Sequence, residues 1–402
     1  MKHHTDMIRI LYVVCLLAFV GCVSTPPAAN DGLGVINLSG DYPTRRVDLK
    51  EIADVEYVAL ETTDSSLLTS MCAYFHISEK YIITSDMYTG DIFFFTRSGK
   101  FIRKVNRKGN GPEEYSNLLD IAIDFKTEEC FIHDLYRKKV HVYTFDGIYK
   151  RSFPWLIAQL NPWCNYNEDY LIGYHGSISL ETFRLKDTHP FYLMSKKDGT
   201  LTPLDITVPN GISSTLNMEK VILAKGEVYY DKAFLPIKPL IMNGDEALIA
   251  DFSLDTLYSF KEGTLAPIAV RTPSVSSTNP PTIIAPEIYT DSFMYFRVIS
   301  MHYDKSDYLK VYDNSEKLVW NRKTNQVEKW DIYNSDMDDS MRRYPLNMNN
   351  TFADKNMGVI FFTAERLITL NNEGKLKGKL KEVASKLQDE EDNKILIIAK
   401  YK

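Results

Sequence analysis

Short runs of β-branched and aromatic residues, separated by polar turns, recur along most of the chain. In Tyr81–Val105, one run ends at Asp86, and a polar loop, a second run and a turn at Gly99 follow it. The same order recurs around Asp134 and Gly147. The two aspartates are 48 residues apart, and so are the two glycines. Because Gly accepts positive φ, such turns predict β-hairpins.

Each unit has the pattern of a four-stranded antiparallel sheet, because a preceding run such as Leu119–Phe125 supplies a first strand. One such sheet cannot bury both of its faces, whereas sheets stacked around a centre can. Less regular copies follow at Phe191–Leu201, Ala247–Leu265, Tyr308–Asn325, and Met357–Phe362 with Ile395–Tyr401. We therefore predict an all-β fold, a six-bladed β-propeller.

The last copy lacks an outer strand, and Asp54–Glu61 is a strand-like run without a unit of its own. Placing Asp54–Glu61 in the last blade closes the ring and leaves no open sheet edge. We expect this N-terminal strand to complete the last blade. The segment Gly378–Lys394 breaks the β pattern and predicts a short helix followed by an acidic loop.

The N-terminus has the features of an export signal. A basic start precedes Ile10–Val20, an uncharged run that is too short to span a bilayer. Gly21-Cys22 follows and resembles the cleavage site of a bacterial lipoprotein, in which Cys22 becomes the lipidated first residue. Ordinary secretory cleavage near Ala28 is the alternative. The absence of an acidic run after Cys22 favours an outer-membrane anchor that faces the periplasm over one at the cell surface.

We thus expect a signal peptide at 1–21, a lipidated linker at 22–40 and a propeller domain at 41–402. The net charge of −6 argues against non-specific binding to nucleic acid. Three cysteines remain after the anchor, and we expect Cys72, Cys130 and Cys164 to be buried free thiols.

Several motifs in their order resemble the six-bladed β-propeller lipoproteins of gut Bacteroides. They are the lipoprotein start, Gly99–Val105, Gly109–Tyr115, Asp255–Tyr258 and the C-terminal Asp389–Lys402. Lys394 replaces a proline of that family after Asn393. The blade pattern is also similar to NHL and TolB-like propellers, which include binding modules and enzymes. The resemblance implies that the protein has this fold and is exported, and it implies no particular activity.

Propeller topology places the loops between second and third strands, and those between blades, on one face. We expect that face to offer aromatic, charged and amide side chains suited to a glycan or an extended peptide. The candidate residues are Tyr88, Arg107, Asn110, Glu113, Glu114, Tyr115, Arg137, Lys138, Trp155, Trp163, His175 and Arg184. The alternative is that they are ordinary solvated loop residues.

Other positions on these loops have structural explanations. Asp86, Asp134 and Asp251 each end a strand, where a carboxylate accepts hydrogen bonds from the following turn. Gly109 and Gly111 permit a tight turn between blades, and the loop lacks the Lys-Ser/Thr of a phosphate-binding loop. We expect all five to shape the turns.

No catalytic motif with known spacing is present. The leading hypothesis is a non-enzymatic, envelope-anchored module that binds a glycan or an envelope protein, a monomer with no cofactor. The alternative is a metal-assisted hydrolase or lyase of NHL-like type, and only that alternative requires Ca²⁺ or Zn²⁺.

Overall fold

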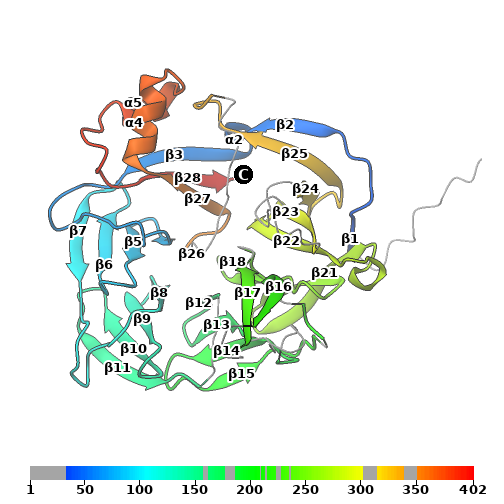
Figure 1. Ribbon diagram of the computed structural model, residues 1–402, viewed down its shortest axis with the longest axis horizontal. Coiled ribbons are helices and arrows are strands. Elements are labelled where there is room, and N and C mark those ends of the chain that lie inside the picture. The colour runs from blue at the N-terminus through cyan, green and yellow to red at the C-terminus, as the bar shows by residue number, and fades with distance from the viewer. Residues whose placement is uncertain are drawn as a thin grey trace, which may run out of the picture. The chain divides into compact units, whose positions relative to one another are not determined.

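Six antiparallel sheets surround a common centre in the computed structural model (Figure 1). The structure describes residues 33–156, 162–176, 186–208, 210–212, 215–222, 228–234, 237–301, 315–338 and 351–402. Nearly all of them belong to one unit, Gly34–Lys402. The fold is a six-bladed β-propeller, so the predicted fold class is confirmed.

The first three blades each contain four consecutive strands. Blade 1 comprises β4 (Phe75–Ile77), β5 (Tyr81–Ser85), β6 (Ile92–Thr96) and β7 (Phe101–Val105). Blade 2 comprises β8 (Asp120–Asp124), β9 (Glu129–Asp134), β10 (Lys139–Thr144) and β11 (Tyr149–Pro154). Blade 3 comprises β12 (Trp163–Asn165), β13 (Tyr170–Tyr174), β14 (Phe191–Ser195) and β15 (Leu201–Pro203).

Blades 4 and 5 follow the same order, and each gains a fifth, parallel strand at its outer edge. Blade 4 comprises β18 (Leu240–Asn243), β19 (Glu246–Ile249), β20 (Thr256–Lys261) and β21 (Thr264–Thr272), with β1 (Gly34–Asn37) beside β21. Blade 5 comprises β22 (Thr282–Tyr289), β23 (Phe293–Ser300), β24 (Glu316–Asn321) and β25 (Val327–Tyr333), with β2 (Thr44–Asp48) beside β25. The sequence analysis did not foresee β1 or β2.

Blade 6 joins the two ends of the propeller. Its strands are β27 (Met357–Phe362), β28 (Ile395–Tyr401) and β3 (Ala53–Ala59), and β3 runs antiparallel to β28 along its whole length. This pairing confirms that an N-terminal strand completes the last blade. With β1 and β2, the N-terminal segment lies along the outer edges of three successive blades (Figure 1).

The remaining elements lie outside the regular blades. They are α2 (Leu49–Ile52), the 3-10 helix Val275–Ser277, β26 (Thr351–Phe352) beside β4, and the separate hairpin of β16 (Thr215–Ile222) and β17 (Val228–Phe234). Between β27 and β28 the chain forms α4 (Ala364–Asn372) and α5 (Gly378–Ala384). The helix expected after Gly378 is confirmed, whereas α4 was not predicted. None of the described helices is long and apolar enough to cross a membrane.

The core consists of apolar layers between neighbouring blades. Between blades 1 and 2, for example, Ile83 and Phe94 pack against Ile121 and Ile132 of the next sheet. Each sheet thus buries both faces. Cys72, Cys130 and Cys164 are buried free thiols, as predicted.

The repeating turn glycines pack each blade against the preceding one. Gly99, Gly147 and Gly199 have φ values of 89°, 77° and 78°. A Cβ on Gly147 would lie 2.7 Å from Cγ1 of Val105 at the end of β7, and a Cβ on Gly199 would lie 2.7 Å from Cδ2 of Phe153 on β11. The 48-residue spacing of glycines therefore reflects a contact between blades as well as a turn.

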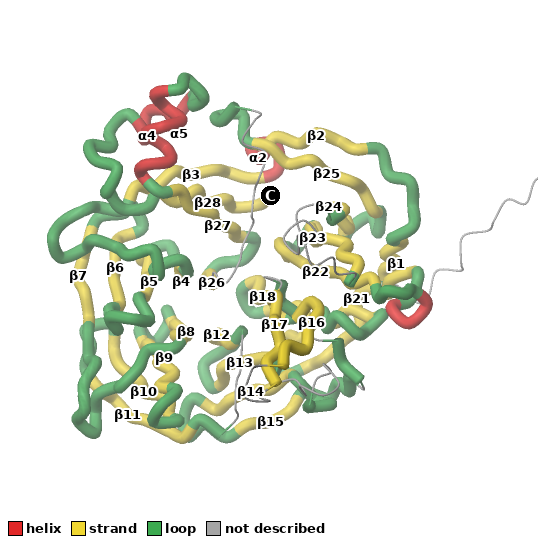
Figure 2. Tube along the Cα trace, in the orientation of Figure 1, coloured by secondary structure: helices red, strands yellow, loops and turns green. Residues whose placement is uncertain are grey.

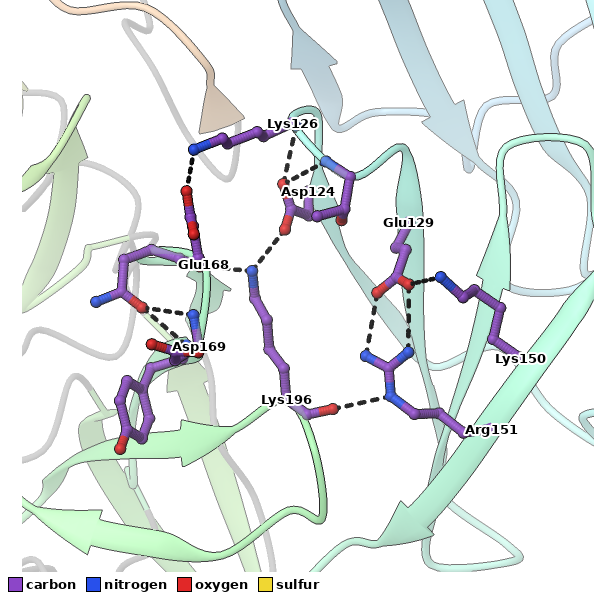
Figure 3. Close-up of polar contacts among 11 residues, drawn as sticks. Asp124, Lys126, Glu129, Lys150, Arg151, Glu168, Asp169 and Lys196 are labelled. Atoms are coloured by element: carbon purple, nitrogen blue, oxygen red, sulfur yellow. Dashed lines mark hydrogen bonds and ion pairs between the residues drawn. The ribbon is translucent and has the colours of Figure 1, made fainter.

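The residue that follows the third strand of a blade also contacts the preceding blade, through its side chain. Lys196 Nζ lies 2.6 Å from Asp124 Oδ2 of blade 2, and both side chains are almost fully buried (Figure 3). At the equivalent positions, Arg97 pairs with Glu56 at 2.8 Å and Arg322 with Glu246 at 2.9 Å. In the described structure, a cation that follows the third strand thus forms an ion pair with the preceding blade at three junctions.

Beside the buried pair, a second cluster joins blades 2 and 3. The guanidinium of Arg151 bonds Glu129 through two nitrogens, at 3.2 and 3.0 Å, and its Nε donates to the carbonyl of Lys196 at 3.0 Å (Figure 3). Blade 2 therefore holds both the backbone and the side chain of Lys196.

Replacing Gly147 with Ala should destabilise the protein more than replacing Gly263 with Ala. Gly263 has nearly the same φ, 76°, but no atom within 4 Å of a Cβ built there. Both substitutions impose a left-handed strain of roughly 1–2 kcal/mol. Only Gly147→Ala adds the overlap with Val105, which we expect to cost about 1–3 kcal/mol more. Urea denaturation measures both losses, and equal losses would mean that the turn makes no contact with the preceding blade.

Replacing Lys196 with Met should lower stability by about 3–5 kcal/mol, because it leaves a buried carboxylate unpaired. The matched control is Lys197→Met, which removes an exposed charge beside it. Burial raises the pKa of Asp124, and hydrogen bonds from Lys196 and Thr127 outweigh that effect and hold the pKa below its usual value.

The sign of the pH dependence follows from this balance. In the native protein, the contribution of Asp124 to the free energy of unfolding is present at neutral pH. It is lost only as the pH falls through the lowered pKa of Asp124. In Lys196→Met the pKa of Asp124 rises, so protonation relieves the penalty as pH falls. Urea denaturation should show the difference between the two proteins shrinking from about pH 7 to about pH 4. A difference that stays constant over that range would show that Asp124 does not depend on Lys196.

Candidate functional site

Four loops emerge at the same end of blades 1 and 2 and form what we call the loop platform, residues 60–74, 86–91, 106–119 and 134–138. The strand register places them together, because Ser85 at the end of β5 pairs with Ile92, which in turn pairs with Val105 at the end of β7. These loops appear in green beside β4 to β11 in Figure 2.

Residues just before the C-terminal strand hold the first loop. Asn393, almost fully buried, donates to the carbonyls of Glu61 and Ser66, both at 2.8 Å. Lys394 donates to the carbonyls of Thr69 and Cys72 at 3.0 and 2.6 Å. Burial lowers the pKa of Lys394. Lys394 thus ties the platform to the last blade.

Hydrogen bonds join the first loop to the next two. Asp86 accepts from the Thr69 hydroxyl at 2.5 Å and from the backbone N–H groups of Tyr88 and Thr89. Burial raises the pKa of Asp86, but these three bonds together hold it below its usual value. Lys108 Nζ donates to the carbonyl of Tyr88 at 2.6 Å. The loops are therefore fixed relative to one another.

Arg137 organises the loop that contains Gly109 and Gly111. Its guanidinium donates to the carbonyls of Gly111, Glu114 and Gly109 at 2.7, 2.8 and 3.2 Å. The Glu114 carboxylate accepts from the Gly111 N–H at 2.8 Å. The hydroxyl of Tyr115, whose ring is fully buried, donates to the carbonyl of Gly90. Glu114, Tyr115 and Arg137 thus belong to the framework of the platform and not to its surface.

The strand-ending aspartates have comparable partners. Asp134 accepts from the backbone N–H and the hydroxyl of Ser116, at 2.6 and 2.8 Å. Asp251 accepts from the N–H of Ser253 at 2.9 Å. Burial raises the pKa of Asp251 to about 6. In each case the carboxylate fixes a loop that leaves the strand end.

The surface of the platform is apolar. Among the described residues nine large hydrophobic side chains are exposed, and eight of them lie on this face. We call these eight the apolar loop patch: Leu67, Met71, Tyr74, Met87, Tyr88, Leu135, Tyr136 and Leu156. Tyr88 and Tyr136 are the most exposed, at 67% and 76%. The ninth, Ile148, lies in the turn between β10 and β11, at the opposite end of its blade.

Beside the part of the patch that blade 2 and the loop before it supply, the exposed charged side chains are mostly basic. The exposed charged residues at 106–118 and 135–139 are Arg107, Lys108, Glu113, Lys138 and Lys139. Asn110 is exposed as well. This part of the face is therefore cationic in a chain whose net charge is −6.

Trp155 and Trp163 lie in the junction between blades 2 and 3 and not at the surface. Their exposed fractions are 7% and 4%, so neither ring offers a face to a ligand. Trp155 stacks on His133 with ring centroids 3.7 Å apart, and Trp163 meets Trp155 edge-on. Burial lowers the pKa of His133 to about 4, with Asp134 acting in the opposite direction.

Of the last two predicted residues, only His175 lies among the described residues, directly after β13. His175 Nδ1 lies 3.4 Å from Asp187 Oδ2. Arg184 lies outside the described residues, as does Cys22.

Sequence reasoning missed a group of ionisable side chains on or just before the innermost strands: His76 on β4, Asp120 on β8, and Lys238 two residues before β18. Burial raises the pKa of Asp120 to about 6 and lowers that of Lys238 to about 8. Burial also lowers the pKa of His76 to about 3. Each residue comes from a different blade, so no local motif signals the group. In the part of the chain that the structure describes, no three His, Cys, Asp or Glu side chains are placed to hold a metal ion.

Several solved structures are similar to the chain at low sequence identity, and the first of them supports the fold. A Bacteroides fragilis protein assigned as exported has 14% identity and a TM-score of 0.60, with 92% of this chain and 99% of that chain covered. A member of the DUF4221 family from Bacteroides vulgatus has 10% identity and a TM-score of 0.49, over 87% and 98% of the chains. A streptogramin B lyase has 11% identity and a TM-score of 0.37, over 87% and 98%.

No curated protein matches the chain. A family model described as a domain of unknown function, DUF4934, matches residues 33–400, which is nearly the whole propeller and its N-terminal strands. The chain therefore belongs to the DUF4934 family.

Proposed function

We propose that this protein is an envelope lipoprotein that binds a partner protein, without catalysis, through the apolar loop patch. The observation that carries the proposal is the concentration of exposed apolar side chains on one face of blades 1 and 2. Exposed apolar side chains are unfavourable in water, and their concentration on one face of a protein is typical of a binding site.

The framework of the loop platform supports the same function. Binding costs free energy whenever side chains and loops must be ordered, so a preformed surface binds more tightly. Here Asp86, Arg137 and Asn393 fix the backbone beneath the exposed side chains. Five of the eight patch residues are Tyr or Met, two residue types that are enriched in protein interfaces.

The basic residues beside the patch favour an acidic partner segment that also carries apolar side chains. Opposite charges at an interface speed association and select among partners. A glycan is the alternative ligand, because Tyr88 and Tyr136 expose aromatic rings. The metal-assisted hydrolase or lyase, of the NHL type, has no supporting observation among the described residues.

The N-terminal segment supports export and anchoring. Ile10–Val20 followed by Gly21-Cys22 has the order of a lipoprotein signal. The exported assignment of the B. fragilis relative in fold agrees with this location. We place the protein at the outer membrane, facing the periplasm in preference to the cell surface.

A photo-crosslinking residue at Tyr88 or Tyr136, in cells that export the protein, should capture one discrete partner protein. The same residue at Ile148, which is 61% exposed in the turn between β10 and β11 and does not belong to the apolar loop patch, is the control. With the purified partner, Tyr88→Ala combined with Tyr136→Ala should weaken binding at least about tenfold, since buried tyrosines are common hot spots. Ile148→Ala should leave binding unchanged.

Equal capture from position 148, or unchanged affinity of the double variant, would contradict a role for the patch. If an oligosaccharide binds instead, and the two tyrosine substitutions abolish that binding, the ligand is a glycan and the partner-protein proposal fails.

Substituting Cys22 with Ser should release the protein from the membrane fraction. A lipid chain contributes about 0.8 kcal/mol of membrane affinity per buried CH₂, and no described helix could replace it. Cell fractionation and mass spectrometry of the N-terminus measure the outcome. If the native mature chain begins near Ala28, or if the Cys22→Ser variant stays in the membrane fraction, the proposal of a lipid anchor is wrong.

A further inference from the structure

Two opposite charges lie at the centre of the ring, where innermost strands begin. Asp120 is the first residue of β8, and Lys238 precedes β18 by two residues. The platform loop 106–119 leads directly into Asp120, so the group lies at the platform end of these strands. Between blades 2 and 4, β12 packs beside β8 (Figure 1). We call Asp120 and Lys238 the central ions.

The ammonium of Lys238 acts on groups of three other blades. Burial raises the pKa of Asp120 to about 6, while the N–H of Ile121 and the charge of Lys238 act in the opposite direction. Burial raises the pKa of Cys164 on β12 to about 12, again against the effect of Lys238. Burial lowers the pKa of His76 on β4 to about 3, and Lys238 lowers it further. Because charges influence one another strongly only at short range, the ammonium lies near the axis of the ring.

No direct contact matches either of the central ions. Asp120 and Lys238 interact electrostatically but form no ion pair with each other. Lys238 makes no hydrogen bond to any described residue, and Asp120 Oδ1 accepts from the N–H of Ile121 at 2.8 Å. Trp163 lies close enough to lower the pKa of Asp120, although its buried Nε1 has no hydrogen-bond partner. Desolvated charges without contact partners are costly, and a molecule that paired with both would remove that cost.

Both central ions can be reached from solvent. Burial shifts the pKa of Asp120 upward and lowers that of Lys238 to about 8, yet each side chain remains partly exposed. Groups that are crowded by protein and still accessible line a concave part of the surface. A desolvated group with a specific charge partner in such a place is typical of a binding site.

We propose that the central ions bind a small zwitterion of the amino-acid type. Its carboxylate accepts from Nζ of Lys238, and its ammonium donates to the free oxygen of Asp120. This site lies outside the apolar loop patch and does not depend on the partner protein.

Charge selects this class of ligand over others. With pKa values of about 6 and about 8, Asp120 and Lys238 are both largely ionised near pH 7. An anion would leave Asp120 unpaired, a cation would leave Lys238 unpaired, and a neutral sugar would offer neither of the charge-assisted hydrogen bonds. Only a molecule with both charges matches the two residues.

Calorimetric titration of the mature chain at pH 7 tests the proposal with glycine, β-alanine and γ-aminobutyrate. These zwitterions differ in the separation of their two charges. Acetate and methylamine each carry one charge alone. The best zwitterion should bind at least about tenfold more tightly than either of them, since each lacks one charge-assisted hydrogen bond.

Variants of the central ions should lose this binding. Asp120→Asn and Lys238→Met should each weaken binding of the best zwitterion at least about tenfold. Lys379→Met, which removes an exposed charge on α5, is the control and should bind as the native chain does. The double variant should not bind, and without ligand it should melt at or above the native temperature, because two desolvated charges are gone.

Several results would overturn the proposal. They are no binding of any of the three zwitterions at millimolar concentration, equal binding of acetate or methylamine, and full affinity in the double variant. A double variant that melts well below the native temperature would assign the central ions to the stability of the fold instead. None of these outcomes bears on the partner-protein proposal, because the variants leave the apolar loop patch intact.

Discussion

Each blade of this propeller has two apolar faces, and only its neighbours in the ring can cover them. The seam between the last blade and the first is therefore the point on which the fold depends. Strand β3 occupies that point, with Ala59 opposite Ile395 and Ala53 opposite Tyr401. Without β3, β28 would present an open edge of unpaired backbone groups. Val58, which β3 contributes, packs with Phe75 of blade 1 in the layer that closes the ring.

Closure of the ring positions the candidate site. The chain leaving β3 becomes the first loop of the platform, and Asn393 and Lys394 tie that loop to the start of β28. The same strand pair that removes the exposed edge thus organises the apolar surface of the platform.

The sequence predicted those parts of the fold that depend on local chemistry. The turn glycines and strand-ending aspartates revealed the blades, since each needs a particular residue at a fixed spacing. Strands β1 and β2 were missed because a parallel strand added at a sheet edge requires no distinctive pattern of its own. Trp155 and Trp163 were expected at the surface, but loop position alone does not show that two rings fill a junction between blades. The exposure of Leu135 and Tyr136 arises only from the folded chain.

The most direct test of this account is a disulfide between β3 and β28. Val55→Cys combined with Ala399→Cys places two cysteines directly opposite each other, within the separation that a disulfide requires. Val55→Cys with Ile397→Cys moves one partner two residues along the strand and is the control. Mass spectrometry after mild oxidation should show a disulfide in the first variant alone. A disulfide in the control, or in neither variant, would contradict closure of the ring by the N-terminal strand.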